Sequence, residues 1–171
     1  NKKFCDAGKS IRIEIVRTGH WFQWRRSLRR TLVQHNIQEH TMIEVRPAIE
    51  KDLQQILDIY NDAIVNTTAV FQYDVHTIEM RREWFAQKQK DRYPVFVAEE
   101  GDAVVGFSTF GPFRNWPGYK YTVEHSIYVK NGHRRKGIGS ILMRPLIDNA
   151  RALRYHTIIA GIDADNTASI E

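Results

Sequence analysis

The sequence predicts an α+β or mixed α/β fold with a central sheet. Segments in which every second residue is apolar, typical of strands, alternate along the chain with segments whose apolar residues recur every three or four positions, typical of helices. The resulting order is strand, helix, helix, three strands, helix, strand and helix, which is characteristic of a sheet covered by helices. The length of 171 residues suits one such domain.

The first elements of the body follow from short patterns. The segment MIEVRPAI predicts a strand that ends near Pro47, because proline removes a backbone donor. Asp52 is then expected to help start a helix. A second helix is expected over residues 78–89. The apolar stripe of the first helix is Leu53, Ile56, Leu57, Tyr60 and Ile64, and the inward residues of the second are Met80, Trp84 and Phe85.

The later elements form a second group. The segment YPVFVAEEGDAVVGFSTFG predicts a hairpin, because two apolar runs flank a Glu-Gly-Asp turn. Residues 121–129 predict a fourth strand and residues 156–162 a fifth, with a helix between them. The segment DADNTASIE predicts the start of a last helix. The apolar side of the helix between the strands is Ile138, Ile141, Leu142, Leu146, Ala150 and Leu153.

Composition excludes several classes of protein. Apolar residues make up 42% and charged residues 26%, both ordinary for a globular domain. No apolar run approaches the roughly 20 residues of a membrane span. Cys5 is the only cysteine, so no internal disulfide and no cysteine-rich metal site is expected. We therefore expect a cytoplasmic protein without a metal.

Charge divides the chain into two regions. Residues 1–40 hold nine Lys or Arg and three acidic residues, whereas residues 41–171 hold 16 and 17. No nucleic acid is therefore expected to bind the body. Residues 1–40 are expected to form a basic arm of unknown role. A helix in it with Arg25, Arg26, Arg29 and Arg30 would suit nucleic acid or an anionic membrane; the alternative is a tail that packs loosely.

The segment GHRRKGIGSILM places glycines and cations directly before an apolar helix. The first amides of a helix are unpaired and carry partial positive charge, so they suit phosphate oxygens. Gly137 and Gly139 leave room for a close approach to the backbone, and Arg134, Arg135 and Lys136 add ionic attraction. A pyrophosphate is the expected ligand; the alternative is a glycine-rich turn with solvated charges.

Residues 134–139 match the R/Q-x-x-G-x-G/A signature of the GNAT (GCN5-related N-acetyltransferase) superfamily. Five further segments resemble its phosphinothricin and methionine sulfoximine N-acetyltransferase branch, so the resemblance covers about residues 43–171. They are IYNDAIVNTTAVF, YPVFVAEE, FGPFRNWPGY, TVEHSIYV and IAGIDADNTAS. The resemblance implies the GNAT fold, with a mostly antiparallel sheet flanked by helices. It also implies acetyl-CoA as cosubstrate and transfer of its acetyl group to a small amine.

Glu124 is the candidate general base. A carboxylate within an apolar strand is costly unless it is solvated, paired or used, and the resemblance places this glutamate beside the acceptor amine. The alternative is an ion pair with a nearby arginine. His125 is the rival base, but it points to the opposite face of the strand, where a packed histidine is the simpler interpretation.

The resemblance also implies which residues bind the cosubstrate. The backbone of Ile127, Tyr128 and Val129 would pair with the pantetheine arm, and one N–H would polarise the acetyl carbonyl. Asn166 would contact the cofactor further along; the alternative is a helix cap. The residues expected at the pyrophosphate are Arg134, Arg135, Lys136, Gly137, Ile138, Gly139 and Ser140.

The acceptor is expected to lie against an aromatic loop. Arg114 could bind a carboxylate with its planar guanidinium, and Phe71, Phe113, Trp116 and Tyr119 could wall a small pocket. The resemblance supports this loop as the amino-acid recognition site. From the residues alone, plain packing is an equal alternative.

The sequence departs from the family in two ways that matter. Pro145 lies within the pyrophosphate helix and is expected to kink it. The chain stops at Glu171, so the domain is expected to lack C-terminal strands, and residues 11–16 or a partner copy could cover the sheet edge. An inactive CoA-binding remnant is therefore an alternative to an active enzyme. A homodimer is possible from the resemblance alone.

Overall fold

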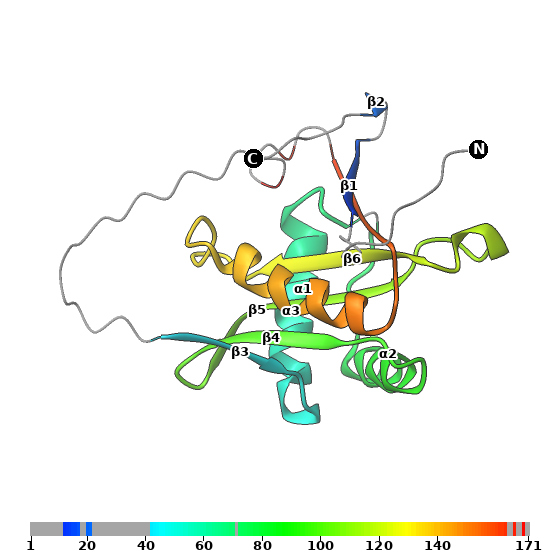
Figure 1. Cartoon of the computed structure of the whole chain (residues 1–171). Helices are drawn as coiled ribbons and strands as arrows, with labels where there is room; N and C mark the ends of the chain where they lie inside the picture. The colour runs from blue at the N-terminus through cyan, green and yellow to red at the C-terminus, as the bar shows by residue number, and fades with distance from the viewer. Residues whose placement is uncertain are drawn as a thin grey trace, which may run out of the picture.

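The computed structural model describes residues 42–70, 72–163, 166 and 169 in full, and the backbone of residues 12–17 and 20–21. Its centre is one sheet with the strand order β2-β1-β7-β6-β5-β4-β3 (Figure 1). The predicted class, a mostly antiparallel sheet flanked by helices, is confirmed: within β3 to β7, only β6 and β7 pair in parallel.

The body begins with β3 (Ile43–Pro47), the short helix η1 (Glu50–Asp52) and α1 (Leu53–Asn66). An ion-pair network ties them to the next strand. Arg46 donates to both oxygens of Asp52, at 2.7 and 2.9 Å, and to both oxygens of Glu99, at 2.7 and 2.9 Å. Asp52 also accepts the amide of Ile49 at 2.8 Å, so its side chain fixes the turn into α1.

The second helix, α2, spans Ile78–Lys90 and begins where the Thr77 hydroxyl accepts the amide of Met80. The inward face differs from the prediction at one position. Met80 is 45% exposed, while Arg81 is 2% exposed. The Arg81 guanidinium lies 4.1 Å from the centre of the Tyr60 ring and 4.6 Å from that of Trp84, so aromatic faces compensate its burial.

The remaining elements are β4 (Val95–Glu100), β5 (Ala103–Pro112), η2 (Pro117–Tyr119), β6 (Thr122–Val129), α3 (Ile138–Ala152) and β7 (Thr157–Ile162). They match the predicted strands and helix within one or two residues, and α3 continues through Pro145. The last helix expected from the sequence lies almost wholly outside the described residues.

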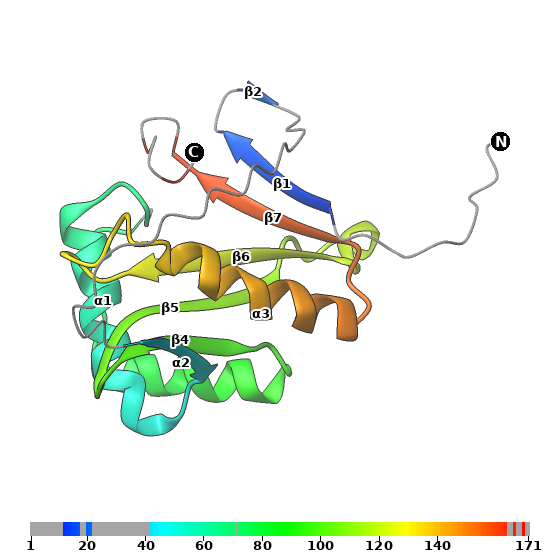
Figure 2. The same ribbon diagram turned by 60° about the vertical axis from the view of Figure 1, so that its left-hand side comes forward.

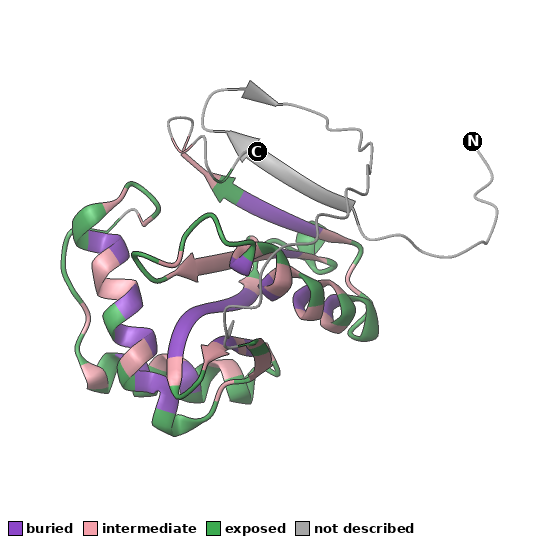
Figure 3. Cartoon of the chain, turned by 90° about the vertical axis from the view of Figure 1, so that its left-hand side faces the viewer, coloured by how far each residue is buried: buried purple, intermediate pink, exposed green. Residues whose placement is uncertain are grey.

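The sheet has a hydrophobic cluster on each face. Val97, Val104 and Phe107 pack beneath α1 and α2, whereas Ala98 and Val105 pack beneath α3 (Figure 2). β5, between them, is buried along most of its length (Figure 3). Because side chains alternate along a strand, each residue of β6 can be assigned to the α1 and α2 face or to the α3 face.

The strand β1 (Arg12–Arg17) lies in parallel beside β7, from Arg12 opposite Thr157 to Arg17 opposite Ile162, and β2 (His20–Trp21) pairs with β1. The alternating segment of the arm is thus a strand at the β7 edge of the sheet. The amphipathic helix predicted over Trp24, Leu28 and Leu32 lies outside the described residues. In the described part of the chain, no helix is long and apolar enough to cross a membrane.

Candidate active site

Strand β6 is paired unequally along its two edges. Its ladder with β5 runs from Val123 opposite Pro112 to Val129 opposite Gly106. Its ladder with β7 covers only Thr122 to His125. In the described part of the chain, residues 126–129 therefore have no strand partner on the β7 edge, although alternate backbone groups of a strand point to that edge. An extended ligand could pair with this half of β6.

Glu124 stands where the two strands separate. It lies on the α1 and α2 face together with Ser126 and Tyr128, and it is half-buried. A Cβ placed on Gly161 of β7 would lie 2.9 Å from Glu124 Oε1, so the carboxylate covers this glycine. Burial raises the pKa of Glu124, and the positive charge of Arg114 opposes the rise. A carboxylate with a raised pKa is suited to accept a proton.

The two alternatives for Glu124 can be compared with this geometry. Among the described residues, no cation forms an ion pair with Glu124. His125 points to the α3 face, and burial lowers its pKa to about 4. Its Nδ1 is buried and has no partner in the described part of the chain. A neutral, enclosed imidazole on the far side of the sheet is poorly placed to serve the same acceptor as Glu124.

The glycine-rich loop after β6 exposes a row of amides. Gly132, Arg135 and Gly137 have φ values of +80°, +64° and +77°, so the chain turns sharply before α3. The amides of Ser140 and Ile141 donate to the Gly137 carbonyl, at 3.1 and 3.2 Å. Among the described residues, the amides of residues 134, 135, 137, 138 and 139 donate no hydrogen bond, and Lys136 closes only a turn onto His133. Unpaired amides at a helix N-terminus form an anion site.

The loop has room for phosphate oxygens. A Cβ on Gly137 would meet nothing within 4 Å, and one on Gly139 would meet only Ile127 Cγ2, at 4.0 Å. The backbone can therefore be approached from outside, and the loop fits a pyrophosphate. Arg135 and Lys136 are exposed. Arg134 is exposed as well, but its guanidinium has protein partners: Nε donates to the Val129 carbonyl at 3.4 Å, and Nη2 lies 3.6 Å from the Asp62 carboxylate of α1.

The aromatic loop between β5 and β6 projects from the same end of the strands as Glu124. The rings of Phe113 and Tyr119 meet edge to face at 5.3 Å. The Arg114 guanidinium lies 5.0 Å from the centre of the Phe113 ring. Trp116 is 72% exposed, so it walls no enclosed pocket in this structure. Phe71 lies outside the described residues.

Asn166 is described without its immediate neighbours. Its amide donates to the Asp163 carbonyl at 3.0 Å, and its carbonyl accepts the amide of Ser169 at 3.1 Å. These bonds form a turn after β7.

Two residues at the site were not predicted from the sequence. Gly161 makes room for the Glu124 carboxylate; a glycine within an apolar strand was the available signal, because such glycines often mark a close approach. Lys88 of α2 places Nζ 3.0 Å from a Cβ built on Gly111, the residue opposite Glu124 on β5. Lys88 lies among other charged residues at the end of α2, so no pattern in the sequence indicates that it approaches the site.

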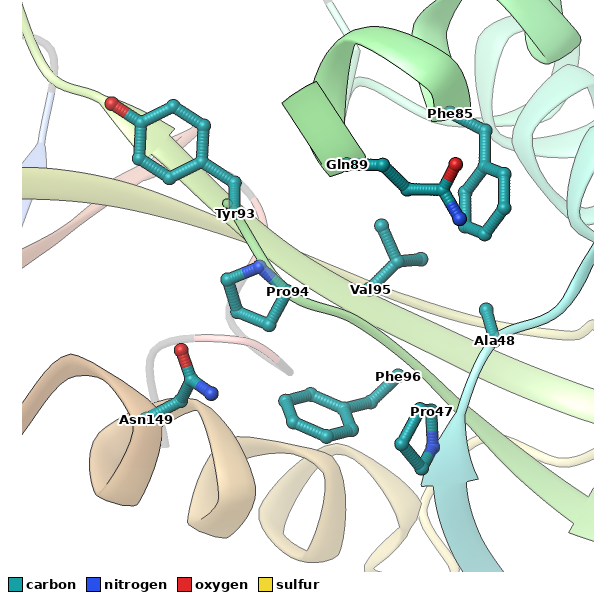
Figure 4. A pocket seen from close by; sticks show the side chains of 9 residues that line it. All are labelled: Pro47, Ala48, Phe85, Gln89, Tyr93, Pro94, Val95, Phe96 and Asn149. Carbon is teal, nitrogen blue, oxygen red and sulfur yellow. The ribbon is translucent and has the colours of Figure 1, made fainter. Parts of the chain in front are cut away.

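A separate pocket of about 250 Å³ lies between the start of β4, the end of β3 and the helices α2 and α3 (Figure 4). Its walls are mainly apolar, with Phe85, Val95 and Phe96 among them, and Asn149 of α3 also lines it. Neither Glu124 nor the glycine-rich loop lines it. Among the described residues, no cluster of three or more His, Cys, Asp or Glu could hold a metal ion.

A half-paired strand beside a carboxylate and a glycine-rich helix N-terminus are features suited to acyl transfer from coenzyme A. The profile of the Acetyltransferase (GNAT) family matches residues 53–171. The chain belongs to this family. It is an N-acetyltransferase of the GNAT type, and acetyl-CoA is its acetyl donor.

Three relatives show how similar the chain is to known members. The L-methionine sulfoximine/L-methionine sulfone acetyltransferase of Salmonella typhimurium is 40% identical over 126 residues, which are 74% of each chain. A crystal structure of an N-acetyltransferase from Staphylococcus aureus Mu50 is 54% identical, with a TM-score of 0.74 over 75% of this chain and 78% of that one. A phosphinothricin acetyltransferase from Sinorhizobium meliloti, in complex with acetyl-CoA, is 32% identical, with a TM-score of 0.71 over 75% and 70%.

Proposed function

We propose that the chain acetylates the free amine of a small amino-acid-like acceptor of the phosphinothricin, methionine sulfoximine or methionine sulfone type, by direct transfer with Glu124 as general base. One observation carries the proposal: the Glu124 carboxylate lies where β6 and β7 separate, next to the unpaired half of β6. The acceptor class is supported by the relatives that act on such amino acids.

Two backbone segments would bind acetyl-CoA. The open edge of Ile127, Tyr128 and Val129 would pair with the pantetheine arm, and one amide would polarise the acetyl carbonyl. The amides that follow Arg134 would bind the pyrophosphate, with Arg135 and Lys136 at the entrance. Ile138, Gly139 and Ser140 form the first turn of α3 behind them, and Asn166 would contact the cofactor from the turn after β7.

The bonds of the reaction balance without a metal or a covalent enzyme intermediate. Acetyl-CoA supplies an acetyl group on a thioester. Glu124 takes one proton from the acceptor ammonium, directly or through water, because only the neutral amine is a nucleophile. The amine nitrogen then bonds to the carbonyl carbon as the carbon–sulfur bond breaks, and the sulfur leaves with the electron pair. The nitrogen releases its second proton to give the amide, and the thiolate takes up one proton, so the two changes cancel. The protein holds the reactants together and polarises the carbonyl.

The aromatic loop would recognise the acceptor. The charge of Arg114 is close enough to lower the pKa of Glu124 against the effect of burial, so the two residues face one region. Its guanidinium would bind an oxygen of the acceptor, while Phe113 and Tyr119 would pack against the side chain. Phe71 and Trp116 are proposed as further walls of the acceptor site.

A thiol-release assay tests the proposal. The chain is given acetyl-CoA with L-methionine sulfone, L-methionine sulfoximine, phosphinothricin, or simple alkylamines of similar size. We expect CoA release with the amino-acid acceptors and at least tenfold lower kcat/KM with the alkylamines. Turnover that is equal for both groups would contradict amino-acid recognition. CoA binding without turnover on any acceptor would support the alternative of an inactive remnant.

A further inference from the structure

Lys88 is a cation that the proposed reaction does not yet use. It belongs to α2, and its Nζ donates to the Phe110 carbonyl at 2.8 Å. The ammonium also lies 5.4 Å from the centre of the Tyr93 ring and 5.9 Å from that of Trp84. Among the described residues, no carboxylate comes within ion-pair distance of it.

One of its hydrogens has a structural use. The ladder between β4 and β5 ends with Val95 opposite Thr109, and the residue before Val95 is Pro94, which has no amide hydrogen. Strand β4 therefore offers no backbone donor to the Phe110 carbonyl, which instead accepts from Lys88 Nζ at 2.8 Å and from the Thr109 hydroxyl at 3.3 Å. An ammonium has three hydrogens, so this bond leaves two of them available for another acceptor.

Lys88 also lies across the strands from Glu124. Its Nζ covers Gly111, which is opposite Glu124 in the β5–β6 ladder. Because opposite residues place their Cβ atoms about 5 Å apart, Nζ lies within about 8 Å of the Cβ of Glu124. The carboxylate of Glu124 leans the other way, over Gly161. The Lys88 ammonium thus lies over Gly111 of β5, and the Glu124 carboxylate lies over Gly161 of β7. The two charges are on opposite sides of β6.

This arrangement matches the chemistry of an α-amino acid. Such a molecule carries its ammonium and carboxylate on one carbon, so a base for the amine and a cation for the carboxylate must lie on the same face and within reach of one small molecule. Glu124 and Lys88 lie on the same face of the sheet, and Lys88 Nζ lies within about 8 Å of the Glu124 Cβ. Gly111 and Gly161 have no side chains, so the Lys88 ammonium and the Glu124 carboxylate can lie close over the backbone of the two neighbouring strands.

We propose that the Lys88 ammonium binds the α-carboxylate of the acceptor, which leaves Arg114 for the oxygens at the far end of its side chain. The proposal rests on the proposed function and refines it: the enzyme selects α-amino acids over amines through a residue of α2. Burial lowers the pKa of Lys88 to about 8, with Asp91 opposing the change, so the ammonium form still predominates at neutral pH.

The test compares L-methionine sulfone with its α-carboxamide, which keeps the amine and removes the negative charge. The variants are Lys88→Met, Lys88→Arg and, as a matched control from the same helix, Lys90→Met, whose side chain is exposed. Lys88→Met should raise the KM of the sulfone roughly 10- to 100-fold, the usual value of a hydrogen bond to a charged group. The KM of the carboxamide should not change. Lys88→Arg should restore most of the preference for the carboxylate, and Lys90→Met should behave as wild type.

Loss of the Phe110 bond could also lower the stability of Lys88→Met. The ratio of kcat/KM for the two acceptors, measured in one preparation, does not depend on the folded fraction, so it remains informative. An unchanged ratio in Lys88→Met would overturn the proposal and leave Lys88 as a purely structural donor. A wild-type chain that acetylates neither acceptor would instead contradict the proposed function itself.

Discussion

Two clusters of partly buried charge lie in this molecule, and they are organised in opposite ways. In the first, Arg46 forms four hydrogen bonds with Asp52 and Glu99, and every charge has a partner. In the second, Lys88 and Glu124 stand across β6 from one another and form no ion pair among the described residues.

This difference between paired and unpaired charges distinguishes the side chains that stabilise the fold from those that can bind a ligand. Charges that are removed from water are stable when they are paired, and the Arg46 network joins β3, β4 and the start of α1 in this way. Glu124 and Lys88 form no ion pair among the described residues, so both charges can meet a ligand. Burial of a charged side chain that has no ion-pair partner disfavours its charged form. It therefore raises the pKa of Glu124 and lowers the pKa of Lys88.

The largest expected effect belongs to Glu124→Gln. The amide cannot take a proton, so kcat should fall roughly 100- to 1,000-fold while CoA affinity stays within about twofold. Burial raises the pKa of Glu124, so as pH falls the wild-type activity should begin to decline at a higher pH than it would with an ordinary glutamate. This acidic decline in activity should be absent from the variant. Steady-state rates across pH and calorimetric titration of CoA measure both effects. An unaltered rate and profile in the variant would remove Glu124 from its role.

The next effect concerns the paired cluster. Arg46→Met leaves the buried Asp52 without its partner and should lower the free energy of unfolding by about 3 kcal/mol. Burial raises the pKa of Asp52, but the hydrogen bonds from Arg46 and the Ile49 amide and the charges of Arg46 and Lys51 together lower it below its ordinary value, so the native carboxylate resists protonation. The Arg46 contribution is thus present at neutral pH and is lost as pH falls below about 4.

Urea unfolding at pH 7 and pH 3 checks this prediction, with Arg82→Met, an exposed arginine of α2, as control. The stability gap between wild type and Arg46→Met should narrow at pH 3, and kcat per folded molecule should not change at pH 7. A large loss of kcat with normal stability would mean that the network acts in catalysis, contrary to the comparison.

The smallest expected effect comes from Gly161→Ala. Gly161 has no positive φ, so alanine suits the backbone, and the added Cβ would lie 2.9 Å from Glu124 Oε1. A flexible carboxylate can move aside at little cost, so the melting temperature should hold while kcat falls roughly threefold to tenfold, the effect of a displaced base. Full activity would show that the position of the carboxylate over Gly161 is unimportant.

The sequence predicts the frame of the molecule well, for physical reasons. The alternation of residues 121–129 and the helical spacing after Gly137 are strong periodic signals, and the structure confirms both elements. The prediction that Met80 faces inward is wrong. Met80 is hydrophobic, but the helix turns Arg81 toward the core instead and buries it between aromatic rings.

The candidate site was only partly accessible from the sequence. Glu124 and the glycine-rich loop carry local signals, a charge within an apolar strand and glycines before a helix. The approach of Lys88 and Gly161 to Glu124 depends on strand register and helix packing between distant segments, which no local pattern encodes. The roles of Arg114 and Asn166, and the division of the chain at residue 40, remain predictions.

The central claim is that acetyl-CoA pairs with the open edge of β6 and with the amides before α3. Hydrogen exchange of backbone amides, with and without saturating acetyl-CoA, tests this directly. The account predicts slower exchange over residues 126–129 and 135–140 and no change around Arg46. Protection that spared both segments, or that fell on the pocket beside Phe96 instead, would contradict it.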